Sequence, residues 1–253
     1  MKLNMILIGL ALLLLATVTV SAQDSTGSDQ VLAEDRPFLL NYPNIEDSDG
    51  RVVLTNDLVV LQRLYVAAGE WEGLHSHPGN QIYVHIQGGE WSGRLGGESE
   101  YDGILSPDGE IGWMDPIPLS AGHESGNTGD NDIDLIYVTL KKDAPVAPEA
   151  EHSPQQFPDI QPDLLLENDR MIVQRVILEP GQWTGAHGHP GNQVFVVIKG
   201  GARSERSGGV SYGPSTDLQA GSVDWLDAVD PGEAHDVGNT GGTSIEFVLV
   251  TIK

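Results

Sequence analysis

The chain has 253 residues, with 13 lysine and arginine side chains against 37 aspartate and glutamate side chains, and a formal net charge of −24. A surface this negative repels nucleic acids and anionic membranes, so we expect neither as a partner. Cysteine is absent, which excludes disulfides, thiolate zinc sites and iron–sulfur clusters. The length suffices for two modest domains, each with its own core.

Residues 1–22 have the pattern of an export signal. Lys2 supplies a positive charge, residues 6–15 are apolar, and Val20-Ser21-Ala22 ends the segment in small residues. An uncleaved membrane anchor is the alternative, but the apolar run is short for a span of about 20 residues. We therefore expect a cleaved signal, a secreted or periplasmic protein, and no membrane contact after cleavage.

A pattern of three histidines and one glutamine is written twice, with an offset of 112 residues between the copies (75 to 187). Histidine is the commonest metal-ligating side chain, and histidines at a fixed, repeated spacing indicate metal binding. The sequence predicts one metal ion in each half, up to two per chain. The predicted ligands are His75, His77, Gln81 and His123 in the first copy, and His187, His189, Gln193 and His235 in the second.

The spacing within each copy suits a strand that ends in a tight turn. Residues i and i+2 of a strand project to one face, so His75 and His77 point together. Pro78-Gly79-Asn80 is a turn sequence, after which Gln81 begins the neighbouring strand. Two imidazoles and one amide oxygen then face a common point, which His123 reaches from a later strand.

The repeat extends beyond the histidines and sets the domain boundaries. Gly88-Gly89 matches Gly200-Gly201, and Gly126-Asn-Thr-Gly129 matches Gly238-Asn-Thr-Gly241, all at the same offset. Only a duplicated domain explains this repetition without gaps. A proline-rich stretch between the copies is typical of an extended connector. The predicted units are a first domain with an N-terminal arm (residues 23–142), a linker (143–162) and a second domain (163–253).

The local pattern predicts strands rather than helices. Residues 81–87 alternate in polarity, and residues 194–199, 133–140 and 245–252 are rich in β-branched and aromatic side chains. Glycine and proline interrupt the chain every 8 to 12 residues or so, which is typical of all-β barrels and sandwiches. We therefore expect an all-β fold, with no long helix after the export signal.

These motifs resemble those of the cupin family, in the two-domain form called a bicupin. The first cupin motif is Gly, five residues, His-x-His, three or four residues, Glu, six residues, Gly. Its spacing is kept from Gly69 to Gly88 and from Gly181 to Gly200. The second motif keeps its histidine and asparagine in both copies, whereas its turn residues are partly replaced. The resemblance implies two tandem antiparallel β-barrels of the jelly-roll type, each with a metal ion inside.

One position departs from the family motif, because Gln81 and Gln193 stand where it has glutamate. A neutral amide leaves the site one unit more positive, which favours an anionic ligand and a stronger Lewis acid but weakens metal affinity. The glutamate is present in the cupins of oxalate chemistry, so its loss disfavours that chemistry. The mixed nitrogen and oxygen donors suit a divalent Fe, Mn, Zn, Ni, Co or Cu ion.

Tyr83, His85 and Arg63 are the candidate catalytic residues. Continuing the alternation from Gln81 places Tyr83 and His85 on the metal side, where His85 would act as a general acid or base. The alternative for His85 is a ring packed inside the barrel. Arg63 could pair with a substrate carboxylate, and a structural ion pair is its alternative.

The signal pattern predicts export, and the resemblance implies a metal-dependent enzyme of the dioxygenase or isomerase type, acting on a small anionic or enolisable molecule. The alternative is a non-catalytic protein that binds a metal or a small ligand, and the complete histidine sets disfavour a storage protein. The acidic run at residues 130–134 lacks the glycine and terminal glutamate of an EF-hand loop, so we do not expect calcium there. The sequence predicts no particular oligomeric state.

Overall fold

The computed structural model describes residues 33–40, 51–141 and 153–253, and the chain from Val31 to Lys253 forms one compact unit. The predicted export signal and residues 142–152 of the predicted linker lie outside the described residues. No helix in the described part is long and apolar enough to cross a membrane. Its helical segments are the 3₁₀ turns Arg36–Phe38, Leu119–Ala121 and Pro231–Glu233.

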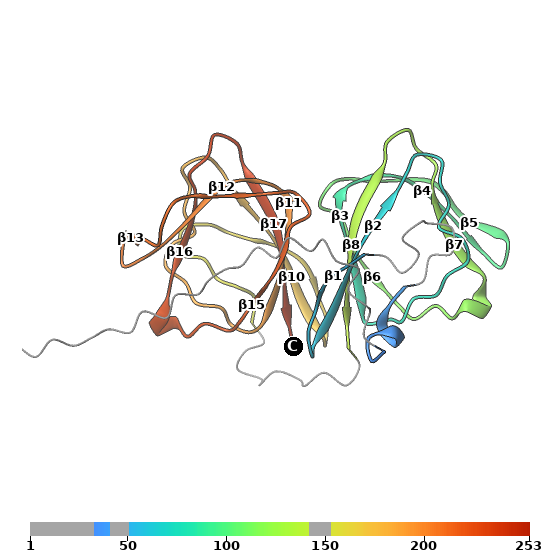
Figure 1. Cartoon of the computed structure of the whole chain (residues 1–253), viewed down its shortest axis with the longest axis horizontal. Helices are drawn as coiled ribbons and strands as arrows, with labels where there is room; N and C mark the ends of the chain where they lie inside the picture. The colour runs from blue at the N-terminus through green and yellow to red at the C-terminus, as the bar shows by residue number, and fades with distance from the viewer. Residues whose placement is uncertain (1–32, 41–50, 142–152) are drawn as a thin grey trace, which may run out of the picture. The chain divides into compact units, whose positions relative to one another are not determined.

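The first repeat folds into two antiparallel sheets, coloured blue to green in Figure 1. The larger sheet has the order β1-β2-β8-β3-β6 and the smaller one has the order β5-β4-β7. The strands are β1 (Arg51–Thr55), β2 (Val59–Val66), β3 (Gln81–Gln87), β4 (Gly89–Leu95), β5 (Glu98–Ser106), β6 (Ile111–Met114), β7 (His123–Asn127) and β8 (Ile133–Leu140).

The second repeat has the equivalent pair of sheets, with the orders β9-β10-β17-β11-β15 and β13-β12-β14, and β16 pairs with β12. The predicted strands at residues 81–87, 133–140 and 245–252 are β3, β8 and β17, so the all-β prediction is confirmed. The strands are β9 (Asp163–Glu167), β10 (Met171–Leu178), β11 (Gln193–Lys199), β12 (Gly201–Ser207), β13 (Val210–Ser211), β14 (Thr216–Leu218), β15 (Val223–Leu226), β16 (Asp236–Asn239) and β17 (Ile245–Ile252).

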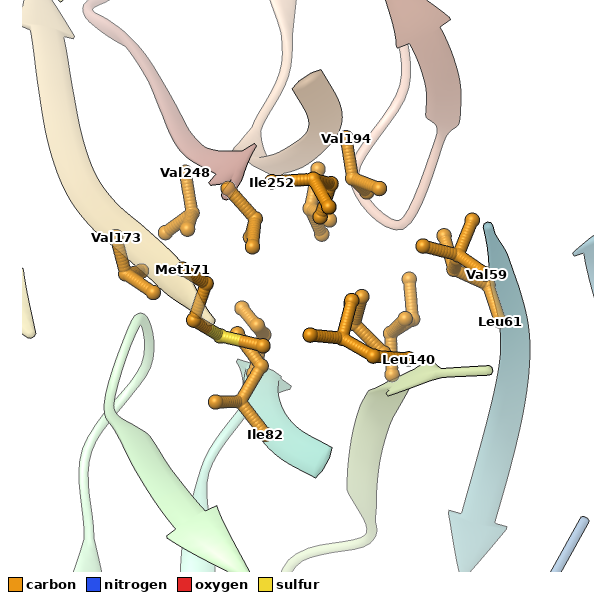
Figure 2. Packing of buried hydrophobic residues seen from close by; sticks show 14 of the residues in the cluster. Val59, Leu61, Ile82, Leu140, Met171, Val173, Val194, Val248 and Ile252 are labelled. Atoms are coloured by element: carbon orange, nitrogen blue, oxygen red, sulfur yellow. The ribbon is translucent and has the colours of Figure 1, made fainter. Parts of the chain in front are cut away.

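The central strands of each larger sheet are buried on both faces. Along β3, Gln81 and His85 lie on one face, whereas Ile82 and Val84 lie on the other, as the two-residue period of a strand requires. The apolar faces of the two large sheets share a single core, which Figure 2 shows in close-up. Residues labelled there include Val59, Leu61, Ile82 and Leu140 from the first repeat, and Met171, Val173, Val194, Val248 and Ile252 from the second.

Two equivalent ion pairs lie where one barrel meets the other. Arg63 donates two hydrogen bonds to the Asp134 carboxylate, at 2.9 and 2.7 Å, and a third to the Gly221 carbonyl of the second barrel at 3.4 Å. Arg175 and Glu246 form the matching pair at 2.6 Å, beside a loop of the first barrel. The outer-face position of Arg63 therefore serves the contact between the barrels.

The end of the predicted linker belongs to the second barrel. The Gln155 backbone N–H donates to Gln174 Oε1 at 2.6 Å, and Gln174 Nε2 donates back to the Gln155 carbonyl at 3.1 Å. Phe157 is buried among the apolar residues inside this barrel. Leu40 of the N-terminal arm makes the same two bonds with Gln62, at 2.9 and 3.2 Å. An incoming segment therefore closes each barrel through an equivalent glutamine.

Candidate metal centres

The first His-x-His pair lies on an extended segment held by isolated bridges. His75 pairs with His123 at the start of β7, and His77 pairs with Ile117. The sequence predicts a regular strand here, and the structure differs because each histidine pairs with a different segment. The predicted turn is confirmed, since Gly79 and Asn80 both have a positive φ and Gln81 begins β3.

Three imidazoles of the first barrel converge on one point. His75, His77 and His123 are all buried, and each places a ligand atom within 4.8 Å of the others. The Nε2 atoms of His75 and His77 are 3.1 Å apart. Two nitrogens bound to one metal ion at about 2.0–2.1 Å have a similar separation.

Hydrogen bonds fix which ring nitrogens can bind a metal. His75 Nδ1 donates to the Gly73 carbonyl at 2.9 Å, and His77 Nδ1 donates to Gln81 Oε1 at 3.0 Å. The Gln81 amide is oriented in turn by Thr139, whose Oγ1 accepts from Gln81 Nε2 at 2.6 Å. With both Nδ1 protons engaged, the two Nε2 lone pairs face one another, which is favourable when a cation lies between them. Gln81 thus orients a ligand histidine in this structure.

The second barrel repeats the arrangement with His187, His189 and His235, whose ligand atoms again lie within 4.8 Å of one another. His187 Nδ1 donates to the Gly185 carbonyl at 2.8 Å, and His189 Nδ1 donates to the Asp227 carbonyl at 3.0 Å.

Gln193 leaves an acceptor open in this second barrel. Its Nε2 donates to Thr251 Oγ1 at 2.9 Å, whereas its Oε1 is buried without a hydrogen-bond partner. A buried acceptor of this kind has a large desolvation cost unless a proton or a metal ion reaches it. The donor set therefore fits a divalent transition metal.

Burial keeps the histidines in the form that binds metal. Desolvation is the largest cause of the lowered pKa at every one of them, because it disfavours the charged imidazolium. The pKa falls to about 4 at His75, to about 3 at His77 and to about 4 at His235. It is also lowered at His123, His187 and His189. All six rings are thus neutral at pH 7, with a lone pair available to a metal.

Known proteins share this architecture. No protein-family model matches the chain. AerE from Microcystis aeruginosa superposes with a TM-score of 0.54 and 13% identity, covering 86% of this chain and 99% of that one. A salicylate 1,2-dioxygenase from Pseudaminobacter salicylatoxidans superposes with a TM-score of 0.52 and 12% identity, covering 83% of this chain and 77% of that one. A cupin 2 conserved barrel domain protein from Leptotrichia buccalis has a TM-score of 0.46 and 17% identity, covering 80% of this chain and 88% of that one. The chain therefore has the fold of these proteins, with two antiparallel β-barrels of the cupin type in one chain.

A curated relative is also similar in sequence to part of the chain. An oxalate-binding protein from Thermotoga maritima is 31% identical over 90 residues, which is 34% of this chain and 66% of that protein. Together with the two histidine clusters, the fold supports a metal-binding cupin and leaves the metal's identity open.

The structure does not bring His85 to the metal ligands. His85 shares the inner face of β3 with Gln81, but the two residues are four positions apart, which is about 13 Å along a strand. His85 Nε2 accepts from Trp91 Nε1 at 2.9 Å, so its ring packs inside the barrel. Tyr83 lies between the two on the same face, with its ring over Gly112 of the neighbouring strand. Arg63 is on the outer face, in the structural ion pair that was its alternative role.

Other residues near the centres were missed by the predicted set. The Tyr137 ring centroid is 5.9 Å from that of His77, and the Phe157 centroid is 4.6 Å from that of His187. Arg203 contributes to the lowered pKa of all three histidines of the second centre, where it pairs with Glu205. Glu72 lies beside His75 in the first centre. Tyr137, Arg203 and Glu72 differ between the copies, so a search for repeated residues passes over them.

Proposed function

We propose that this bicupin is an exported, metal-dependent enzyme of the dioxygenase or isomerase type, acting on a small anionic or enolisable molecule. The observation that carries the proposal is the pair of histidine clusters, one buried and one half-buried, in which ring nitrogens converge. The three histidines and the neighbouring glutamine are uncharged, so they do not offset the charge of a bound divalent ion, which can attract an anion. The bound metal would polarise a substrate oxygen or bind dioxygen.

The residues around each cluster support chemistry on a carboxylate or enol. In the second barrel, Arg203 adds a positive charge beside the histidines. In the first barrel, Tyr137 supplies a buried phenol near His77, on the same inner wall as Tyr83. A phenol in this place can hold or move a proton on a bound substrate. The buried position of the first centre limits its access to water.

Turnover by the reconstituted protein tests the proposal. The metal-free protein would be loaded anaerobically with Fe(II), Mn(II), Co(II) or Zn(II) and exposed to a panel of small hydroxy and keto acids and phenolic acids. Oxygen uptake reports dioxygenase activity, and proton exchange by NMR reports isomerase activity. We expect metal-dependent turnover that the double variant His77→Ala/His189→Ala loses. The absence of turnover with every metal and acid would contradict the proposal.

A non-catalytic small-ligand binder is the second candidate, and the second barrel favours it. Phe195 and Leu249 stand there in place of Tyr83 and Tyr137, so this centre lacks both phenols and keeps the cationic Arg203. The partial relative is named for binding oxalate. Calorimetric titration of the metal-loaded protein with oxalate tests this candidate. Binding without turnover that Arg203→Ala weakens would support it, and the absence of heat would contradict it.

A further inference from the structure

A buried carboxyl group lies against the first cluster, outside the repeated motif. Glu72 has 0% of its surface exposed, and its Oε2 is 3.4 Å from His75 Nε2, the same nitrogen that faces His77. Ser125 Oγ donates to this Oε2 at 2.9 Å. The other oxygen, Oε1, is buried without a hydrogen-bond partner. A buried carboxylate with an unmet acceptor is costly unless a cation compensates it.

The second barrel shows that the fold does not require this carboxyl group. At the repeat offset of 112 residues, Glu72 corresponds to Thr184 and Ser125 to Val237. Thr184 Oγ1 lies 3.2 Å from His187 Nδ1, the nitrogen that also bonds to the Gly185 carbonyl, so this position carries a hydroxyl beside the other ring nitrogen. Both barrels nevertheless have the same strand orders in their large sheets and the same histidine cluster. Glu72 is therefore an addition specific to the first centre.

Two other acidic groups near the clusters have cationic partners, whereas Glu100, whose Oε2 lies 3.9 Å from His123 Nδ1, is exposed to solvent. Glu124 pairs with Arg94 at 2.7 Å, and its second-barrel equivalent Asp236 pairs with Arg206 at 2.6 Å. No arginine or lysine forms an ion pair with Glu72 among the described residues, where its contact is with His75. A divalent ion beside His75 would supply the missing positive charge.

We propose that Glu72 is the acidic group of the first metal centre, where it supplies the negative charge that Gln81 lacks relative to the cupin motif. This inference rests on the proposed metal-dependent function. The two centres then differ in kind. The first holds its ion more tightly because a carboxylate offsets the ion's charge. The second keeps a more positive ion beside Arg203.

Metal affinity, measured one centre at a time, tests the proposal. The full chain carrying His189→Ala keeps the first centre, and the chain carrying His77→Ala keeps the second. Co(II) would be titrated into each in competition with a chromophoric chelator, and its visible spectrum would report the ligand field. Glu72→Gln should weaken Co(II) binding by about 10- to 100-fold at the first centre. It should also change the spectrum there and leave the second centre unaffected.

Glu70→Gln is the matched control, because it removes one charge from the same loop, where Glu70 accepts from the Ala67 N–H near the surface. It should change Co(II) affinity by less than about two-fold. Unchanged first-centre affinity in Glu72→Gln would overturn the inference while leaving the proposed function intact. Equal weakening at both centres, or by Glu70→Gln, would also overturn it. If neither centre of the unaltered chain takes up Co(II), the proposed function falls together with the inference.

Discussion

Desolvation keeps the cluster histidines neutral in the folded protein, and this makes the free energy of unfolding depend on pH. The pKa of His235 is lowered to about 4, below its ordinary value of 6.5, so the unfolded chain binds the proton more readily than the folded one. The metal-free protein should therefore lose stability as the pH falls from about 6.5 towards 4. Urea unfolding at pH 7.5, 6 and 5 with a chelator checks this. Equal unfolding midpoints at all three values would contradict it.

Proton competition for the metal follows from the same shifts. An ordinary histidine begins to lose a metal ion near pH 6.5, whereas burial lowers the pKa of all three rings of the second centre, to about 4 at His235. In the His77→Ala background, which keeps the second centre, Zn(II) affinity should therefore fall less between pH 7.5 and pH 5.5 than it does at histidines of ordinary pKa. A steep fall through pH 6.5 would show that the rings are solvated.

The pKa of Glu72 is raised, whereas the pKa values of the histidines are lowered. Burial raises the pKa of its carboxyl from 4.5 to about 8, and the Ser125 hydrogen bond opposes this only in part. A raised pKa favours the folded state at low pH and loses that stability as the pH rises from 4.5 to 8. Glu72→Gln should therefore stabilise the metal-free protein by about 1–3 kcal/mol at pH 8, and by less at pH 5. Urea unfolding of both proteins measures this, and destabilisation at pH 8 would contradict it.

The sequence predicts the histidines because the same residues stand at the same spacing in both copies. It does not predict Glu72 or Arg203 as site residues in this way, since each occurs in one copy alone. Parity along β3 correctly places Tyr83 and His85 on the inner face. Parity does not give the distance along the strand, which separates His85 from the ligands. Arg63 follows Gln62 directly on β2, so strand alternation alone puts it on the opposite face from that buried glutamine.

At the scale of elements, the large sheets are stabilised through their outer faces. Leu61 on β2 is 0% exposed within the shared core, whereas Leu164 on β9 is 53% exposed. Leu61→Ala should lower the free energy of unfolding by about 2–4 kcal/mol, because it removes buried methyl groups and leaves a cavity. Leu164→Ala, the same chemical change at the surface, should cost less than about 0.5 kcal/mol. Similar losses in both variants would contradict the observed packing.

The strands were predictable because alternation and β-branched runs are local properties. The segments that close each barrel were not, because Gln155 and Phe157 precede the repeat and follow a proline-rich stretch that resembles a free linker. Their position depends on the long-range pair between Gln155 and Gln174, which no local pattern encodes.

At the scale of the whole molecule, the two barrels share one core, and each barrel contributes an equivalent ion pair beside the contact. Neither large sheet can expose its outer face without uncovering apolar side chains of the other. We therefore expect one cooperative unfolding transition. Calorimetry of the metal-free protein checks this, and two separate transitions would show that each barrel is stable alone.

Metal binding should raise the Tm of that single unfolding transition. A site occupied at about 100 times its dissociation constant stabilises the folded state by about 2.7 kcal/mol. With two centres in one cooperative unit, the His77→Ala and His189→Ala variants should each lose part of the metal-induced shift in Tm. The double variant should lose all of it. If the double variant kept the full metal-induced shift in Tm, the metal would bind outside the two histidine clusters.

Metal content is the most direct test of the central claim, that each barrel carries a metal centre. The protein would be purified without chelators or metal-affinity resin and analysed by elemental mass spectrometry. The two histidine clusters predict about two equivalents of transition metal per chain, and about one in either single variant. No bound metal, and none taken up on titration, would contradict the account.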